Sequence, residues 1–402
     1  MLLTKTKKVL LIIPEMTTGG AQRSLANLSL ELGQFFQVWI VVFNQESPVV
    51  YKHGGKLLSL DVVPGKSWYS KVISFRKRIA RLKKIKKEFA VDIALSFLEG
   101  ADYVNVLSRY KEKIILSIRG SKIHDEIMHE SFFWLRSKIF IPRLYQKADA
   151  LVAVNEGIAN ELHAYYGLSK DKIHTIGNFY DVEAISKLLR EPRTKDLENL
   201  FQHQVLVSTG RLNKEKGLDY IIKIFAKLKG TLPDVKLVVV GDGPEKERLI
   251  LLSKQLGLKS SVQQEWTKIP DVVFTGNQGN VFKFLNKSSL YIVNSSSEGF
   301  PNGLVEAMLC HVPVVSSNCP YGPAEIMAPG SKSDVEAVQI TNYGVLMPIA
   351  KSDETVNIWV DNISQLLKND SLRKKLAENA FVRASEFNKE NVLDRWLKLI
   401  HE

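Results

Sequence analysis

Short apolar runs that alternate with longer amphipathic stretches constrain the fold of this chain more than any other feature. Each run holds three to six residues, mostly Val, Ile and Leu. Parallel strands buried on both faces have this nearly continuous apolar pattern. Because helical stretches separate the runs, we predict βαβ units and an α/β fold with two doubly wound parallel sheets. The expected strands are Val9–Pro14, Val38–Phe43, Asp92–Phe97, Ile114–Ile118, Ala150–Val154, Ile173–Ile176, Val205–Thr209, Lys236–Val240, Val272–Phe274, Leu290–Val293, Val312–Ser316 and Gly344–Met347.

Length and composition predict two domains. The chain has 402 residues, and a domain usually takes about 100–200. A charged stretch at 187–203, interrupted by Pro192, has the composition of a linker. We therefore expect an N-terminal domain over 1–190 and a C-terminal domain over 200–385. The apolar run at 9–14 is too short for a leader or a membrane span, which predicts a soluble or peripheral protein.

Two further features concern compartment and charge. Cys310 and Cys319 fit neither a disulfide framework nor a metal site, which favours a reducing compartment. The chain carries a net charge of +12. Residues 1–190 hold 29 Lys and Arg against 18 Asp and Glu, so the first half carries nearly all of the excess. This predicts an anionic partner for that half, such as nucleic acid, acidic lipid or a phosphate-rich substrate. A merely soluble basic surface is the alternative.

The segment 71–87 concentrates this charge, with nine Lys or Arg residues and no acid. Val72, Phe75, Ile79 and Leu82 are three or four residues apart, so a helix places them on one apolar stripe. A basic amphipathic helix is typical of binding to a membrane surface or an anion. A helix packed on its sheet by the same stripe is the alternative, and both can hold together.

A loop with two carboxylates is the strongest chemical signal. The expected strand 290–293 ends before Glu298, and a helix is expected to begin near Gly303 or Leu304, with Glu306 in its first turn. Amide N–H groups at a helix start favour an anion such as a phosphate. Carboxylates beside it suit sugar or ribose hydroxyls, which donate hydrogen bonds to them.

These residues carry a resemblance to a known family. The stretch EGFPNGLVEAM, with seven residues between Glu298 and Glu306, resembles the hallmark of the family 4 retaining glycosyltransferases of GT-B fold. Other pieces agree in order: Gly19-Gly20 with Arg23, Asn178, Gly210-Arg211 with Lys216, Gly241-Asp242-Gly243, and Gly322-Pro323 with Glu325. The resemblance implies two Rossmann-like domains facing a cleft, with a C-terminal helix within 386–402 crossing back to the N-domain.

The resemblance also implies roles for residues of the C-terminal half. Bond cleavage in a nucleoside-diphosphate sugar leaves negative charge on the β-phosphate, which Arg211 and Lys216 would neutralise. Glu298 would bind the donor sugar and Glu306 the ribose. The remaining donor-site positions implied by the family are Asn302, Gly303, Leu304 and Gly276 in the second half, and Gly19, Gly20, Arg23 and Asn178 in the first. The sequence has no Asp-x-Asp motif in a suitable loop, so we expect neither a metal nor another cofactor.

One departure concerns the acceptor side. Many family members have a His where this chain has Arg119, and an Arg cannot act as a general base because it stays protonated. Arg119 is therefore expected to bind an acceptor phosphate or hydroxyl. His124 is a substitute candidate, and an ordinary histidine at the surface or at a helix start is the alternative. Lys83, Lys84 and Lys87 are expected to bind an anionic acceptor or lipid. The motif variants resemble bacterial enzymes that build lipid-linked glycans, O-antigen or capsule.

Together these features predict transfer from a UDP-sugar, carrying a hexose or N-acetylhexosamine, to a polyprenyl-diphosphate-linked saccharide. The enzyme would work in the cytoplasm, on the inner face of the cell membrane, with 71–87 on that surface and no nucleic acid partner. A UDP-sugar epimerase or a soluble-glucan synthase would share the fold but has no use for a basic membrane helix. A nucleic-acid-binding protein is a remote alternative, because Phe75 is the only aromatic residue within 71–87.

Overall fold

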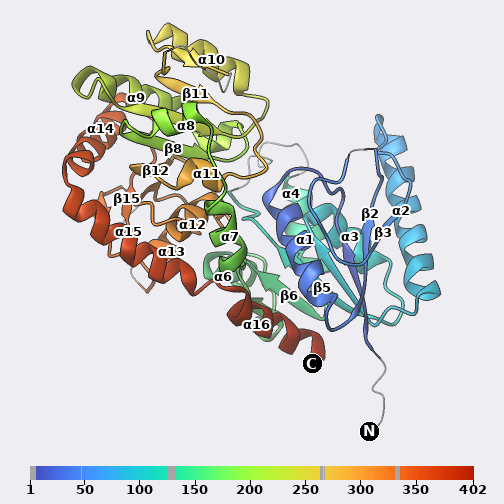
Figure 1. Ribbon diagram of the computed structural model, residues 1–402. Coiled ribbons are helices and arrows are strands. Elements are labelled where there is room, and N and C mark those ends of the chain that lie inside the picture. Colours follow the sequence, from blue (N-terminus) through green and yellow to red (C-terminus); the bar gives the residue numbers. More distant parts are fainter. Residues whose placement is uncertain (1–5, 47, 125–132, 263–265, 267, 331–335) are drawn as a thin grey trace. The chain divides into compact units, whose positions relative to one another are not determined.

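The structure is a computed structural model that describes residues 6–46, 48–124, 133–262, 266, 268–330 and 336–402. The chain forms two compact units (Figure 1). Unit 1 takes residues 1–179 and 390–402, and unit 2 takes residues 180–389. Each unit is an α/β layer structure built on its own parallel sheet, as the apolar runs predict.

Unit 1 contains a seven-stranded sheet in the order β3-β2-β1-β4-β5-β6-β7, with all neighbours parallel. Its strands are β1 (Lys8–Ile12), β2 (Gln37–Val42), β3 (Lys56–Ser59), β4 (Ile93–Phe97), β5 (Lys113–Ile118), β6 (Ala150–Ala153) and β7 (Ile173–Thr175). The apolar runs do not predict β3, an edge strand without a fully buried residue. The strand order reverses between β1 and β4, and the carboxyl ends of strands at such a point commonly bind ligands.

Helices cover both faces of this sheet. They are α1 (Gly20–Leu32), α2 (Trp68–Glu88), α3 (Glu99–Leu107), α4 (Phe133–Leu135), a π-helical segment η2 (Arg136–Phe140), α5 (Ile141–Tyr145), α6 (Glu156–Ala164), the short 3₁₀ segment η3 (Lys170–Lys172) and α16 (Lys389–His401). Val9 and Leu11 of β1 pack in one core cluster with α1 and α16, while Leu10 and Ile12 pack in another with α2. This alternation follows from the two-residue period of a strand.

The C-terminal helix belongs to unit 1, which confirms the predicted return of the chain to the N-domain. Trp396, Leu399 and Ile400 of α16 are buried in the core cluster that holds β1 and β2. The ammonium group of Lys7 donates to the Ile400 carbonyl at 2.8 Å, and that of Lys113 donates to the Leu399 carbonyl at 2.7 Å. The last turn of α16 is therefore held both by apolar packing and by cations, which suit the negative end of a helix dipole.

The basic helix α2 lies beside β2 and β3 (Figure 1), but its packing face differs from the predicted stripe. Phe75, Ile79 and Leu82 pack on the sheet as expected, and Ile85 extends the face. Val72 is exposed, so this part of the prediction is wrong. At about 100° per residue, Val72 lies at the border of the face that the other four residues define.

Unit 2 contains an eight-stranded sheet in the order β10-β11-β9-β8-β12-β13-β15-β14. Its strands are β8 (Val205–Thr209), β9 (Lys236–Val240), β10 (Ser260–Ser261), β11 (Val272–Phe274), β12 (Leu290–Val293), β13 (Val314–Ser317), β14 (Gln339–Ile340) and β15 (Val345–Met347). Seven strands are parallel, and the edge strand β14 pairs antiparallel with β15. The order reverses between β8 and β12, where a ligand site is expected.

The helical segments of unit 2 lie on both sides of its sheet. They are α7 (Val182–Leu189), α8 (Lys195–Leu200), η4 (Lys214–Lys216, a 3₁₀ turn), α9 (Leu218–Thr231), α10 (Lys246–Gln255), α11 (Phe282–Leu285), α12 (Asn302–Leu309), α13 (Pro323–Met327), α14 (Asp353–Lys368) and α15 (Asp370–Ser385). Two core clusters, one on each side of the sheet, hold the buried apolar residues of β8.

The units divide at positions that differ from the expected domain bounds. The first division follows Phe179, ahead of the predicted linker at 187–203, and the second follows Lys389 rather than residue 385. Ile185 of α7 and Leu197 and Leu200 of α8 are buried in a core cluster of unit 2. The charged stretch is therefore a pair of amphipathic helices whose apolar sides pack on unit 2.

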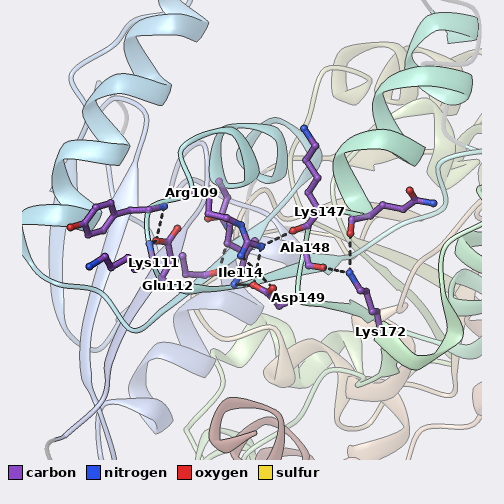
Figure 2. A network of polar contacts seen from close by, with 12 residues as sticks. Arg109, Lys111, Glu112, Ile114, Lys147, Ala148, Asp149 and Lys172 are labelled. Carbon is purple, nitrogen blue, oxygen red and sulfur yellow. Dashed lines mark hydrogen bonds and ion pairs between the residues drawn. The ribbon is translucent and has the colours of Figure 1, made fainter.

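Polar contacts close the amino-terminal edge of the unit 1 sheet (Figure 2). Arg109 pairs with Asp149 at 2.9 Å, and Asp149 also accepts the Ile114 N–H at 2.7 Å. The ammonium group of Lys172 donates to the Ala148 carbonyl at 2.9 Å. These bonds tie together the turns that precede β5, β6 and β7, so this edge has a structural role and the carboxyl edge is the place for a site.

In the part of the chain that the structure describes, no helix combines the length and the apolar character that crossing a bilayer requires.

Candidate functional site

An ion pair at the carboxyl edge of the unit 2 sheet joins two of the predicted site residues. Lys216 follows β8, and Glu298 follows β12, so the strand order brings their loops side by side. The Lys216 ammonium lies 2.5 Å from Oε1 of Glu298. The hydroxyl of Ser295 donates to the same carboxylate oxygen at 2.6 Å. The structure thus places Lys216 and Glu298 together at the point where the strand order reverses.

The backbone fixes both loops at this edge. Gly217 has a φ of 55°, and a Cβ at this position would lie 2.3 Å from the Asn294 carbonyl oxygen, so only glycine allows the close approach. Asn294 in turn exchanges two hydrogen bonds with Ala350, of 2.8 and 3.0 Å. The Ser317 hydroxyl donates to the Ser295 carbonyl at 2.7 Å. Lys216 is therefore held by loops that follow β8, β12 and β15.

The ion pair keeps Lys216 charged. Burial lowers the pKa of Lys216, but the charge of Glu298 and the hydrogen bond to it outweigh burial and raise the pKa above its usual value. Lys216 therefore stays protonated at neutral pH. A protonated, half-buried lysine at this edge of the sheet is a suitable partner for a phosphate oxygen.

Helix α12 begins directly after this loop. It starts at Asn302, one residue before the predicted start, so Glu306 lies in its second turn and is buried. A Cβ on Gly303 would lie 2.4 Å from Thr209 Oγ1 and 2.5 Å from the Tyr291 hydroxyl oxygen. Glycine at this position therefore lets the helix start sit directly on the end of β8 and on Tyr291 of β12.

A residue that the sequence analysis missed steadies the same helix start. The Tyr180 hydroxyl donates to Oδ1 of Asn302 at 2.7 Å, and the Tyr180 N–H donates to the Phe387 carbonyl at 2.9 Å. The Leu304 N–H donates to the Pro301 carbonyl at 3.0 Å, so a ligand would have to share this amide.

Two other predicted residues of unit 2 lie at the same edge of the sheet. Arg211 directly follows the β8 loop glycine and is exposed. Gly276 follows β11 with a φ of 67°, and its carbonyl accepts the Gly241 N–H at 3.0 Å. The predicted donor residues of unit 2 thus all follow the carboxyl ends of strands.

In unit 1, Arg119 and Asn178 form one cluster with a residue that the sequence analysis missed. The Ser24 hydroxyl of α1 donates to Asn178 Oδ1 at 2.8 Å. The Arg119 guanidinium donates to the same Asn178 oxygen and, at 3.1 Å, to the Ser24 hydroxyl oxygen. It also lies over the Phe97 ring, 5.4 Å from its centre. Residues predicted for acceptor and for donor are therefore in direct contact.

The other predicted site positions of unit 1 also come after strands of its sheet. Gly19 follows β1, donates its N–H to the Tyr51 hydroxyl at 3.2 Å and accepts the Arg23 N–H at 3.0 Å. Gly20 is the first residue of α1. His124 is exposed, and its backbone N–H donates to the Ser121 hydroxyl at 2.9 Å. All follow carboxyl ends of strands.

Lys83, Lys84 and Lys87 lie elsewhere. The chain enters α2 from the carboxyl end of β3 and leaves it near the amino end of β1, where the Lys8 ammonium donates to the Phe89 carbonyl at 2.9 Å. The three lysines, in the last turns of α2, are exposed and lie toward the amino edge of the sheet. The structure does not bring them to the cluster of Arg119.

Comparison with known families decides the identity of this arrangement. Residues 18–184 match the family described as Glycosyltransferase Family 4, and residues 193–383 match the family described as Glycosyl transferases group 1. The chain belongs to glycosyltransferase family 4. This retaining family uses nucleotide sugars, so the chain is a glycosyltransferase, as the two glutamates and their loop predict.

The glycosyltransferase has relatives along nearly its whole length. A Campylobacter jejuni protein named N-acetylgalactosamine-N,N'-diacetylbacillosaminyl-diphospho-undecaprenol 4-alpha-N-acetylgalactosaminyltransferase is 26% identical over 401 residues, which span 98% of this chain and 99% of that protein. The structure of sucrose-phosphate synthase from Thermosynechococcus elongatus matches with a TM-score of 0.77 at 15% identity, covering 98% of each chain. Anabaena Alr3699/HepE in complex with UDP and glucose matches with a TM-score of 0.75 at 17% identity, covering 98% and 100%. These likenesses show the GT-B fold.

A first prediction concerns Ser295 of the glycosyltransferase. Its hydroxyl is buried and bonds to Oε1 of Glu298, so it is a positioning residue for that carboxylate. Ser295→Ala is expected to lower kcat for sugar transfer about tenfold, because a hydrogen bond to a charged group contributes roughly 1.5–3 kcal/mol. Ser295→Thr should restore most of the activity. Ser296→Ala, at the exposed neighbouring serine, is the matched control. Equal losses in the Ser295 and Ser296 variants would contradict the positioning role.

Proposed function

We propose that this glycosyltransferase transfers a hexose or an N-acetylhexosamine from a UDP-sugar to a polyprenyl-diphosphate-linked saccharide, with retention of the anomeric configuration. The observation that carries the proposal is the pair of Lys216 and Glu298 beside the start of α12. This arrangement combines a fixed cation, helix-start amides and carboxylates, which suit a diphosphate and the hydroxyls of a sugar. The Anabaena structure with UDP and glucose has the same fold and supports the choice of nucleotide.

In the proposed reaction the donor binds to unit 2. Cleavage of the bond between the anomeric carbon and the β-phosphate oxygen leaves negative charge on that phosphate, which Lys216 and Arg211 stabilise. The same phosphate oxygen takes the proton of the acceptor hydroxyl as the new bond forms on the same face of the sugar. Glu298 binds hydroxyls of the donor sugar, and Glu306 binds the ribose. The cations replace a metal ion in this scheme, so we propose a metal-independent enzyme.

The other donor contacts are proposed from the family pattern. In unit 2 they come from Asn302, Gly303, Leu304 and Gly276. In unit 1 the proposed contacts are Gly19, Gly20, Arg23 and Asn178, which follow strand ends or begin α1. Because Ser24 and Arg119 bond to Asn178, we propose that they orient this amide.

The proposed acceptor follows from the charge of unit 1 and from the Campylobacter jejuni relative. The first half of the chain carries nearly the whole positive excess, and that relative is named for transfer to a diphospho-undecaprenol saccharide. We propose that Arg119 and His124 serve this acceptor and that exposed basic residues of the segment 71–87 face an anionic membrane surface. The enzyme would then work at the cytoplasmic face of the membrane in the assembly of a cell-surface glycan.

A thermal-shift screen tests the donor assignment. UDP, GDP, ADP and a panel of UDP-sugars are added with EDTA present throughout. A ligand at 100 times its Kd stabilises the native state by about 2.7 kcal/mol, which raises Tm by a few degrees. We expect a shift with UDP and its sugars but not with GDP or ADP, and a much smaller shift in Glu306→Gln, which keeps the shape of the side chain. A protein that no nucleotide stabilises would contradict the proposed donor site.

A further inference from the structure

We propose that unit 1 docks on an anionic phospholipid surface through one end of α2, with an apolar tip inserted between the headgroups. The tip consists of exposed apolar residues on the first turns of α2 and on the loop before it: Val63, Trp68, Tyr69, Val72 and Ile73. This inference rests on the proposed membrane acceptor. It names the side chains of unit 1 that contact the lipid and the edge of unit 1 that faces it.

The exposure of the tip is the first observation. Trp68 is 77% exposed and Tyr69 is 63% exposed, although large aromatic side chains usually bury most of their surface. Their rings pack edge to face with centres 5.9 Å apart. Tryptophan and tyrosine concentrate at the boundary between water and hydrocarbon, because each joins an apolar ring to a polar group.

The positive charge near the tip indicates which kind of surface it contacts. Lys66, Lys71, Arg76 and Lys77 lie among or next to the apolar residues in the sequence and are exposed, and the chain has no acidic residue between Asp61 and Glu88. Exposed apolar residues with exposed cations close by in the sequence suit an anionic lipid surface, where each lysine or arginine near the phosphates adds to the binding. A protein partner of ordinary composition would leave this uniform charge without a matching surface.

Hydrogen bonds hold the tip in a fixed conformation, so that its insertion into a lipid surface does not require the loop to become ordered. The hydroxyls and N–H groups of Ser67 and Ser70 form a reciprocal cap at the start of α2. Further along the helix, Ser74 donates to the Val63 carbonyl at 3.1 Å, and Arg78 donates to the Val62 carbonyl at 3.2 Å. These bonds tie the loop to α2, so the exposed apolar residues are presented in one fixed arrangement.

The cations of α2 divide into two sets by what they contact. The guanidinium groups of Arg78 and Arg81 bond to loop carbonyls, and Lys86 is fully buried. These three residues make their contacts within unit 1, so we assign them to the stability of that unit rather than to the membrane contact.

The free cations of α2 lie near the tip or in the last turns. Lys84 lies roughly 20 Å along the axis from Lys71, at about 1.5 Å per residue. That distance exceeds the roughly 8–10 Å over which salt screens charges. If the tip inserts, Lys83, Lys84 and Lys87 therefore add little to lipid binding.

The position of the tip connects it with the site. The chain reaches α2 from the carboxyl end of β3, so the tip lies toward the carboxyl edge of the unit 1 sheet. Gly19, Arg119 and Asn178 follow strand ends at this edge. Docking by the tip would turn the edge that carries the proposed acceptor residues toward the lipid surface, whereas a helix lying flat would not favour either edge.

Vesicle binding tests the proposal with the full chain and with neither donor nor acceptor present. The vesicles contain phosphatidylglycerol and phosphatidylethanolamine in equal parts, and phosphatidylcholine vesicles serve as the neutral comparison. Trp68→Ser with Tyr69→Ser is expected to lower the partition coefficient by about tenfold or more. Lys71→Gln, Arg76→Gln and Lys77→Gln together are expected to lower it by a similar factor. The matched control, Lys83→Gln with Lys84→Gln and Lys87→Gln, should change it less than about threefold.

Fluorescence quenching by brominated lipid tests insertion directly. We expect quenching of the wild-type protein that disappears in Trp68→Phe and persists in Trp134→Phe, because Trp134 is also exposed in unit 1 but lies outside α2. Quenching that depends on Trp134, or binding that depends on the three distal lysines alone, would overturn the proposal. The Tm of each variant shows that it is folded. Because no nucleotide is present, failure here is separate from failure of the donor screen.

Discussion

Lys216→Ala is expected to lower kcat/KM for sugar transfer about 100- to 1,000-fold, the usual loss when one fixed donor is removed from a site that stabilises developing charge. The Lys216 ammonium is positioned by Glu298 at 2.5 Å, and the raised pKa of Lys216 keeps it charged throughout the neutral range. The measurement uses the UDP-sugar that gives the largest thermal shift. We expect most of the loss in kcat, because the charge on the leaving phosphate develops after the donor has bound.

The neighbouring lysine provides the control for this prediction. Lys214 lies in the same 3₁₀ turn and is exposed, so Lys214→Ala removes an equal charge from the same loop. It should change kcat/KM less than about threefold. Lys216→Ala combined with Glu298→Gln should lose less than the product of the two single losses, since the side chains contact each other. If Lys214→Ala is as damaging as Lys216→Ala, net loop charge rather than a placed cation would account for the loss.

Lys216 also shows which features of the site could be predicted from the sequence and which could not. The family resemblance implied that Lys216 and Glu298 share one site, and in the structure the loops that follow β8 and β12 meet where the strand order reverses. The resemblance assigned them to different parts of the donor, and their ion pair is a finding of the structure. Ser295, which holds Glu298, lies three residues away in the sequence and carried no signal, since serine is common in loops of every kind.

The strands were predicted well and the unit bounds less well, for a physical reason. A buried parallel strand has a short apolar sequence that depends little on its partners, and Val205–Thr209 and Leu290–Val293 have the predicted bounds. Helices α7 and α8 are amphipathic, so their charged outer sides looked like a linker, whereas Ile185 and Leu197 fix them to unit 2. The contacts of Tyr180 with Asn302 and of Ser24 with Asn178 join segments more than a hundred residues apart, where spacing gives no information.

The sequence offers no way to divide the nine basic residues of 71–87, whereas in the structure they differ in what they contact. Lys86 is fully buried, and its ammonium lies 2.7 Å from Oε1 of Glu112. It also donates to the carbonyl and to the side-chain oxygen of Asn105, both at 2.8 Å. Burial lowers the pKa of Lys86 to about 8, although the charge of Glu112 opposes this change. A count of charges along the helix therefore includes a residue that serves the core of unit 1.

Lys86→Ala is expected to lower the free energy of unfolding of unit 1 by about 3–5 kcal/mol, because removing one member of a buried ion pair leaves the other charge without compensation. Chemical denaturation followed by circular dichroism measures this change. Lys87→Ala, at the exposed next position of the same helix, should change the free energy by less than about 0.5 kcal/mol.

A paired replacement separates the charge from the packing. Oε2 of Glu112 accepts the Tyr110 and Lys111 N–H groups at 3.0 Å, part of the polar network in Figure 2, and a glutamine can keep these two bonds. Lys86→Met with Glu112→Gln should therefore be less destabilised than Lys86→Met alone, because no unpaired charge remains buried. If the double variant is no more stable than Lys86→Met, the bonds to Asn105 rather than the ion pair hold α2 on unit 1. Since α2 carries the apolar tip, its attachment through Lys86 also sets how firmly that tip is presented.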